Sequence, residues 1–266
     1  MLSLFLSAMK KMKNNKTVLI TGATSGIGKA TAAQFAQNGW NLILTGRRED
    51  RLNELAAGLN NQFESEVRLL VFDVRSQVET ENALESLNTD ERKIDVLINN
   101  AGLAVGKGPV QEGEVDDWER MIDTNVKGLL YVTRKIAPWM IANGSGHIIN
   151  VGSTAGKEAY PGGNVYCATK FAVDALTKGM RIDMLPHGIK VSQIAPGMVE
   201  TEFSLVRFKG DKNQAERVYD GFQPLQPQDV ADVIYYMTSL PPHVCMNDVV
   251  LTATAQANSY LTFKNS

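Results

Sequence analysis

The sequence has few of the residues that build disulfide frameworks and metal sites. Cys167 and Cys245 are its two cysteines, and His147, His187 and His243 are its three histidines, in a chain of 266 residues. Two separated cysteines form neither a disulfide framework nor a metal-ligand pattern. We therefore expect a cytoplasmic protein that needs no metal.

An excess of charge of one sign is also missing. The chain carries 27 Lys and Arg against 29 Asp and Glu, which gives a formal net charge of −2, and the basic residues are scattered. A nucleic-acid-binding protein normally concentrates basic residues on one face. We therefore expect a small-molecule substrate and no nucleic-acid partner.

Long apolar runs are absent from the N-terminus. The apolar stretch at residues 1–9 is too short to span a bilayer, and its lysines follow it, whereas a secretory signal carries them first. We expect residues 1–15 to form a disordered extension with no membrane partner, or to lie partly upstream of a functional start at Met9 or Met12; a weak membrane-surface tether is the further alternative. Residues 16–266 show no composition break and are expected to form one domain.

A glycine-rich loop follows the first predicted strand, residues 17–21. Its sequence is Gly22-Ala23-Thr24-Ser25-Gly26-Ile27-Gly28, and a helical pattern continues to residue 38. Backbone without Cβ atoms can approach a pyrophosphate, and a helix N-terminus offers free N–H groups. A nucleoside-triphosphate loop would need Gly at 23 and Ser or Thr at 30, and both positions are Ala. We therefore predict that the coenzyme-binding residues here are Gly22, Thr24, Ser25, Gly26, Ile27 and Gly28.

The second predicted strand, residues 41–45, ends without an acidic residue. Arg47 and Arg48 follow it after Gly46. In a dinucleotide site this strand end faces the adenosine ribose, where an acid would bind the 2′-hydroxyl of NAD. Guanidinium groups match phosphate instead, so the predicted cofactor is NADP, with a solvated loop as the alternative.

Further strands are predicted at 67–74, 94–102, 146–153, 189–197 and 248–254, and they alternate with helical segments. This alternation predicts an α/β fold with a doubly wound parallel sheet, whose ligands lie at the carboxyl ends of the strands. Asp73 is expected to contact adenine or to cap the next helix, and Asn99 and Asn100 either contact the coenzyme or hold a turn. The remaining predicted coenzyme contacts are Val74, Ala101, Gly102, Pro196, Gly197, Val199 and Thr201.

Ser153, Tyr166 and Lys170 are the predicted catalytic groups. Tyr166 and Lys170 stand four residues apart on one helix face, and Ser153 closes the fifth strand. An ammonium at about 4 Å, at an effective dielectric near 20, would favour the phenolate by roughly 4 kcal/mol. That lowers a tyrosine pKa from about 10 towards about 7, near the best value for an acid/base. A serine hydrolase is disfavoured because Ser153 lacks a G-x-S-x-G elbow.

The joint pattern resembles the short-chain dehydrogenase/reductase family from about residue 16 to beyond 250. The matching motifs are Thr21-Gly22-x-x-x-Gly26-Ile27-Gly28, Asn99-Asn100-Ala101-Gly102, Asn125, Ser153, Tyr166-x-x-x-Lys170 and Pro196-Gly197. The resemblance implies a Rossmann-type sheet of seven strands in the order 3-2-1-4-5-6-7 and hydride transfer at a nicotinamide. It further implies that Tyr166 is the acid/base, that Ser153 orients the substrate, that Lys170 also binds the nicotinamide ribose, and that Asn125 holds a proton-relaying water.

The segments around Ser153, Tyr166 and 199–211 are similar to NADP-dependent 3-hydroxy acid (serine 3-) dehydrogenases. This similarity implies L-serine, L-allo-threonine and related substrates, and a homotetramer. Arg207 lies in an otherwise apolar stretch and is predicted to bind the substrate carboxylate; a surface or subunit ion pair is the alternative. Residues 201–222 are the candidate lid. Two other functions stay open: reduction of a 3-oxoacyl, sugar or dicarbonyl substrate, and regulation by a silent NADPH-binding protein.

Overall fold

The computed structural model describes residues 15–63 and 65–264. The extension predicted at residues 1–15 therefore falls almost entirely outside the described residues. Within the described ranges, no helix is long and apolar enough to cross a membrane.

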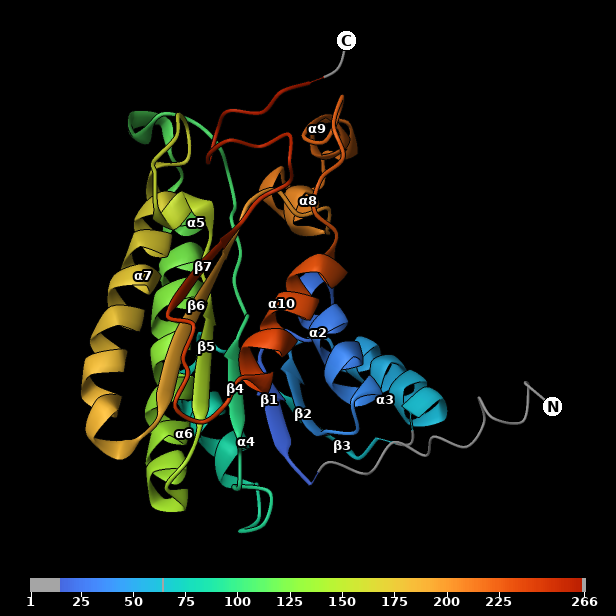
Figure 1. Ribbon diagram of the computed structural model, residues 1–266. Coiled ribbons are helices and arrows are strands. Elements are labelled where there is room, and N and C mark those ends of the chain that lie inside the picture. The colour runs from blue at the N-terminus through green and yellow to red at the C-terminus, as the bar shows by residue number, and fades with distance from the viewer. Residues whose placement is uncertain (1–14, 64, 265–266) are drawn as a thin grey trace, which may run out of the picture.

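A seven-stranded parallel sheet in the order β3-β2-β1-β4-β5-β6-β7 forms the centre of the fold (Figure 1). This confirms the predicted topology. The central strands β4 and β5 are buried at every position, as expected where helices cover both faces of a parallel sheet. The strands are β1 (Thr17–Ile20), β2 (Asn41–Gly46), β3 (Val67–Val71), β4 (Val96–Asn99), β5 (His147–Val151), β6 (Lys190–Pro196) and β7 (Asp248–Leu251).

Helices cover both faces of the sheet (Figure 1). The α2, α3 and α10 side encloses one apolar core, which includes Phe35, Trp40 and Ile234. The opposite face carries α4, α6 and α7 over a second core around Leu97 and Ile136. The helices are α2 (Gly26–Gln37), α3 (Glu49–Phe63), α4 (Gln77–Glu85), α5 (Val115–Ile122), α6 (Leu129–Asn143), α7 (Asn164–Met184) and α10 (Pro227–Ser239).

Several strands end earlier than the sequence pattern predicts. β3 stops at Val71, although the apolar pattern continues to residue 74, and β4 stops at Asn99 instead of 102. The extra residues lie beyond the carboxyl ends of these two strands. Apolar character alone does not distinguish a buried strand from the buried loop that follows it.

A covering segment, residues 199–225, leaves the end of β6 and returns to α10. It contains two short helices, α8 (Phe203–Arg207) and α9 (Lys212–Arg217). A parallel bridge between Val199 and Leu225 joins its two ends. In Figure 1 the two helices stand beyond the carboxyl edge of the sheet, where the sequence predicted a lid.

Candidate active site

A crevice runs along the carboxyl ends of the central strands, between the sheet edge and the covering segment. Most of the predicted coenzyme and catalytic residues line it; Gly28, Asn99, Asn125 and Arg207 are not part of its lining. The predicted residues that line it are Gly22, Thr24, Ser25, Gly26, Ile27, Arg47, Arg48, Asp73, Val74, Asn100, Ala101, Gly102, Ser153, Tyr166, Lys170, Pro196, Gly197, Val199 and Thr201.

The glycine-rich loop requires glycine for two separate reasons. Gly22 has φ +67°, and a Cβ there would lie 2.9 Å from the Cα of Ala101. A Cβ at Gly28 would collide with the carbonyl oxygen of Gly22 and lie 2.5 Å from Nδ2 of Asn100. Gly28 therefore acts by letting the helix pack closely on the loop, which explains why it does not face the crevice.

The N-terminus of α2 opens into the crevice without a side-chain cap. Ser25 is the N-cap residue, yet its side chain makes no capping hydrogen bond. Its hydroxyl instead accepts a hydrogen bond from Nη2 of Arg48 at 3.0 Å. The first N–H groups of α2 are thus left for an anion, with the helix dipole favouring negative charge.

The two arginines after β2 both reach the crevice. Arg48 donates from Nε and Nη2 to the Thr24 hydroxyl, at 3.2 and 2.7 Å. Nη1 of Arg47 lies 3.6 Å from Oδ2 of Asp73. Asp73 accepts hydrogen bonds from Arg75 and does not cap α4, because Ser76 performs that role. The capping alternative for Asp73 is therefore wrong.

The paired amides after β4 have different roles. Asn100 donates from Nδ2 to the carbonyl oxygens of Thr21 and Gly22, at 2.9 and 3.1 Å, so it holds the glycine loop in place. Asn99 is buried and donates to Thr133 and Asn150. The Asn99 side chain is thus engaged outside the lining of the crevice, which supports the structural alternative for this residue.

Ser153, Tyr166 and Lys170 converge at the junction of β5 and α7. Ser153 accepts a hydrogen bond from the backbone N–H of Ala155 at 3.1 Å, which fixes its side chain. Lys170 is 7% exposed and donates from Nζ to the Val151 carbonyl at 2.9 Å. Its Nζ lies 6.0 Å from the centre of the Tyr166 ring. The three side chains share one wall of the crevice, as predicted.

The electrostatics of Tyr166 differ from the sequence-based expectation. Burial, helped by the neighbouring Tyr160, raises the pKa of the Tyr166 phenol well above its ordinary value. The groups that lower this pKa are the Ser153 hydroxyl and the Arg207 guanidinium, and Lys170 is not among the main causes. Burial also lowers the pKa of Lys170 to about 8. The pKa expected from the charge of Lys170 alone leaves out the desolvation of both side chains, which disfavours the charged form of each.

Asn125 lies in a π-helical turn, Asp123–Gly128, between α5 and α6. Its Oδ1 accepts from the N–H of Leu103 at 2.8 Å, and its Nδ2 donates to the Leu103 carbonyl and to Thr169. Asn125 thus clamps the chain after β4 against α7. Single π-turns are common at functional sites, but the sequence pattern does not reveal them.

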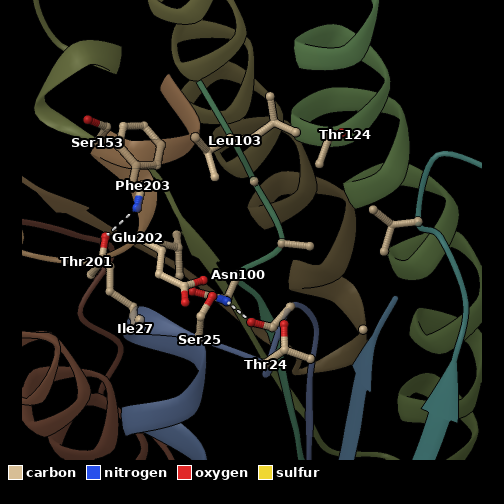
Figure 2. Close-up of a pocket in the computed structure, with 18 of the residues that line it drawn as sticks. Thr24, Ser25, Ile27, Asn100, Leu103, Thr124, Ser153, Thr201, Glu202 and Phe203 are labelled. Carbon is tan, nitrogen blue, oxygen red and sulfur yellow. Dashed lines mark hydrogen bonds between the residues drawn. The ribbon is translucent and has the colours of Figure 1, made fainter. Parts of the chain in front are cut away.

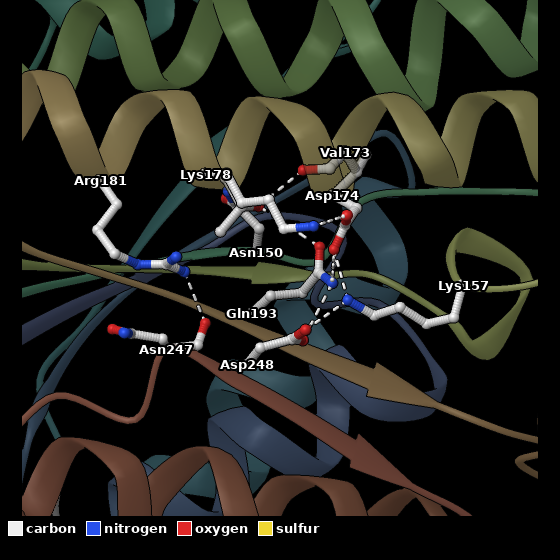
Figure 3. A network of polar contacts seen from close by, with 10 residues as sticks. Asn150, Lys157, Val173, Asp174, Lys178, Arg181, Gln193, Asn247 and Asp248 are labelled. Carbon is white, nitrogen blue, oxygen red and sulfur yellow. Dashed lines mark hydrogen bonds and ion pairs between the residues drawn. The ribbon is translucent and has the colours of Figure 1, made fainter.

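A polar network behind the crevice holds the Ser153 turn against α7 (Figure 3). Lys157, just after the 3-10 turn Thr154–Gly156, donates to Asp174 of α7 and to Asp248 of β7. Gln193 of β6 also donates to Asp174 at 3.0 Å. The turn after Ser153, α7, β6 and β7 are therefore tied together by one cluster.

Arg207 stands behind the crevice wall beside Tyr166. Its Nη1 donates to the Tyr160 hydroxyl at 2.7 Å, and its Cζ lies 5.2 and 5.9 Å from the ring centres of Tyr160 and Tyr166. Nε and Nη2 are buried and have no hydrogen-bond partner. No carboxylate among the described residues pairs with Arg207, which argues against the surface ion-pair alternative.

Several crevice residues were not predicted from the sequence. Arg120 and Thr124 come from α5 and the π-turn, and Glu202 comes from the covering segment. Tyr160, the partner of Arg207, was also missed; its only signal is its place in the loop between Ser153 and Tyr166. The other unpredicted lining residues are Gly46, Phe72, Leu103, Val151, Gly152, Phe203 and Val206.

Comparison with known proteins agrees with this geometry. The family model of short chain dehydrogenases matches residues 16–211. The chain therefore belongs to the short-chain dehydrogenase family, and it is an oxidoreductase.

Relatives within the family are similar over almost their whole length. The chain is 46% identical to sulfoacetaldehyde reductase 2 of Chromohalobacter salexigens, over 90% of this chain and 95% of the relative. It is 44% identical to the NADP-dependent 3-hydroxy acid dehydrogenase YdfG of Escherichia coli K12, over 90% and 96%. The closed form of a serine dehydrogenase complexed with NADP+ superposes with a TM-score of 0.87, at 42% identity, over 94% of this chain and 100% of that one.

Proposed function

We propose that the protein is an NADP-dependent dehydrogenase that transfers a hydride between the nicotinamide and the C3 hydroxyl of a short 3-hydroxy acid. L-serine, L-allo-threonine and 3-hydroxypropionate are the expected substrates. The observation that carries this assignment is the Arg207 guanidinium beside Tyr166, with two buried nitrogens that lack a partner.

The crevice fits a dinucleotide that carries a 2′-phosphate. The uncapped N-terminus of α2 and the close-packed glycine loop suit a pyrophosphate. Arg47 and Arg48 lie where the adenosine ribose of a Rossmann-type site is found, and no acidic residue occupies the end of β2. When bound, the coenzyme supplies the hydride acceptor.

Ser153, Tyr166 and Lys170 supply the proton chemistry of the reaction. Ser153 donates a hydrogen bond to the substrate oxygen, and ionised Tyr166 takes the hydroxyl proton as the hydride leaves C3. Because burial raises the pKa of Tyr166, ionisation needs positive charge nearby; the Arg207 guanidinium lowers this pKa, and the Lys170 ammonium lies 6.0 Å from the ring centre. Asn125, clamped to Leu103, places the chain beside Lys170 and is the candidate to hold the water that passes protons to Lys170.

Arg207 is the residue that recognises the acid group. A buried guanidinium with unpaired N–H groups is costly, and a carboxylate accepts two parallel hydrogen bonds from it. Nε and Nη2 are the two free donors of Arg207. Because they are buried, the acid group reaches them when the covering segment moves away from Tyr160 and Tyr166.

The anion need not be a carboxylate, and this defines a second candidate function. The relative at 46% identity is named sulfoacetaldehyde reductase 2. A sulfonate is also an anion with oxygen acceptors, so the same guanidinium can bind it. Both candidates place an acidic group one carbon away from the reacting carbon. The ratio of kcat/KM for 3-hydroxypropionate and 2-hydroxyethanesulfonate, measured with NADP+, separates them.

Steady-state kinetics of Arg207→Ala test the assignment. Loss of a charge-assisted hydrogen bond to a substrate costs about 1.5–3 kcal/mol, so kcat/KM for 3-hydroxypropionate should fall roughly 10- to 100-fold. Oxidation of 1-propanol, which has no acid group, should fall much less than oxidation of the acid, because it loses only the effect of Arg207 on the pKa of Tyr166. Arg207→Lys should keep part of the activity, because it retains the charge but not the paired donors.

Arg217→Ala is the matched control for this experiment, because Arg217 is an exposed arginine of the same covering segment. Its kinetics should equal those of the wild type. An unchanged KM for 3-hydroxypropionate in Arg207→Ala would overturn the assignment of Arg207. Equal losses on the acid and on 1-propanol would show a structural effect and contradict anion recognition.

The assembly expected from the resemblance is a homotetramer. Exposed apolar side chains support association through the long helices, where Val115, Phe171 and Ile182 are 59%, 42% and 72% exposed. Light scattering coupled to size exclusion tests this, and a monomer at all concentrations would contradict it.

A further inference from the structure

Glu202 places a carboxylate directly over the glycine-rich loop. It is the residue before α8 in the covering segment, and Figure 2 shows its side chain extending towards Ser25. Oε2 accepts from Nη1 of Arg48 at 3.0 Å. Nη1 of Arg51 donates to Oε1 at 2.7 Å and to Oε2 at 2.9 Å. One carboxylate therefore joins two guanidiniums of the β2–α3 region to the covering segment.

The remaining donors of Arg48 fix its direction. Nε and Nη2 bond Thr24, and Nη2 also bonds Ser25, so this edge of the guanidinium faces the loop. Nη1 is the nitrogen that points to Glu202. Glu202 therefore occupies the side of Arg48 on which an incoming anion would be bound.

We propose that Glu202 determines coenzyme selectivity by competing with the 2′-phosphate of NADP for Arg48 and Arg51. This inference rests on the NADP dependence proposed above. Carboxylate and phosphate oxygens suit the same guanidinium donors, and two anions in one such site repel each other. A nucleotide that carries a 2′-hydroxyl does not compete in this way. Glu202 thus lowers the affinity for 2′-phosphorylated ligands while leaving other nucleotides unaffected.

The contact is weak enough to be displaced. The side chains of Glu202, Arg48 and Arg51 are 44%, 40% and 41% exposed. Exposed ion pairs of this kind contribute little to stability and are screened by salt. Displacement by a phosphate would also separate the start of α8 from α3. Coenzyme binding and the position of the covering segment are then linked through this one carboxylate.

Calorimetric titration with 2′,5′-ADP and with 5′-AMP tests the proposal, because both fragments bind without turnover. Glu202→Gln keeps the size of the side chain and removes its charge. It should tighten 2′,5′-ADP binding about five- to tenfold, the scale of two exposed ion pairs, and leave 5′-AMP within about twofold. The gain in affinity for 2′,5′-ADP should be smaller at high salt, where the charges are screened.

Glu200→Gln is the matched control, because Glu200 lies two positions earlier and bonds Gln226 away from the crevice. It should leave both affinities unchanged. Unchanged or weaker 2′,5′-ADP binding in Glu202→Gln would overturn the role of Glu202, as would an equal gain for both ligands. If wild-type protein did not prefer 2′,5′-ADP to 5′-AMP, the NADP assignment itself would fall, and the role of Glu202 with it.

Discussion

The two walls of the crevice are built in opposite ways. One wall is the shelf that carries the proposed catalytic groups, made of β5, the 3-10 turn Thr154–Gly156 and α7; there Tyr166 and Lys170 are 8% and 7% exposed. The other is the covering segment, whose Glu202 and Lys209 side chains are 44% and 54% exposed and form ion pairs with the body of the protein. Proton transfer needs groups held in advance, whereas recognition of a ligand needs a wall that can be displaced.

The largest expected effect is on the shelf. Tyr166→Phe removes the acid/base and nothing else from a buried site, so kcat for 3-hydroxypropionate should fall about 10³-fold. Binding of 2′,5′-ADP should be unchanged, because the fragment does not reach Tyr166. Steady-state kinetics measure the fall in kcat, and calorimetry measures the binding of 2′,5′-ADP. A variant that kept a tenth of the wild-type kcat would show that another group moves the proton.

A pair of glycine substitutions compares the packing of the two walls. A Cβ at Gly156 would lie 2.6 Å from the backbone oxygen of Lys170, so Gly156→Ala should cost about 3 kcal/mol of unfolding free energy. At Gly210 no atom lies within 4 Å, and only its φ of +93° opposes Ala, at about 1 kcal/mol. Urea unfolding of both variants measures the two losses of unfolding free energy. Equal losses would contradict the difference between the walls.

Low pH should lower the free energy of unfolding through His147, a buried residue of the strand that belongs to the shelf. His147, at the start of β5, is buried against Ser192, and burial lowers its pKa to about 3. Between that value and the unfolded pKa of about 6.5 the unfolded chain binds more protons, so stability falls as the pH drops through this range. At pH 5 the loss should be about 2 kcal/mol relative to pH 7.

Unfolding by urea at the two pH values measures this loss. His147→Gln is the control, because it removes the titrating group; the variant should lose that part of the pH dependence whatever its own stability. An equal pH dependence in both proteins would show that other groups cause the acid sensitivity.

The smallest effect is expected from an ion pair of the covering segment. Nζ of Lys209 lies 2.7 Å from Oδ2 of Asp117, and Asp117 also lies 3.8 Å from Arg120. Lys209 is 54% exposed, and the buried Asp117 keeps Arg120 as a second partner, so Lys209→Ala should change KM for 3-hydroxypropionate less than about threefold. A tenfold change in the steady-state KM would mean that this contact holds the covering segment in place.

Local signals in the sequence predicted the parallel α/β sheet and most of the crevice residues, whereas the order of the strands followed from the family resemblance. Strand periodicity, the glycine loop and the spacing of Tyr166 and Lys170 each involve residues that are close together in the sequence. The elements it missed depend on contacts between distant segments: the π-turn around Asn125, the pairing of Arg207 with Tyr160, and Glu202 over Arg48. The pKa of Tyr166 was misjudged for the same reason, because its burial is created by the folded structure.

The proposed activity of this chain is the oxidation of short 3-hydroxy acids with NADP+. Its most direct test is to follow NADPH formation by absorbance with purified protein, NADP+ and a panel of L-serine, L-allo-threonine and 3-hydroxypropionate. The proposed activity predicts turnover on the panel, with 1-propanol far slower. Equal or faster turnover of 1-propanol, or no turnover of any acid by protein that binds 2′,5′-ADP, would contradict it.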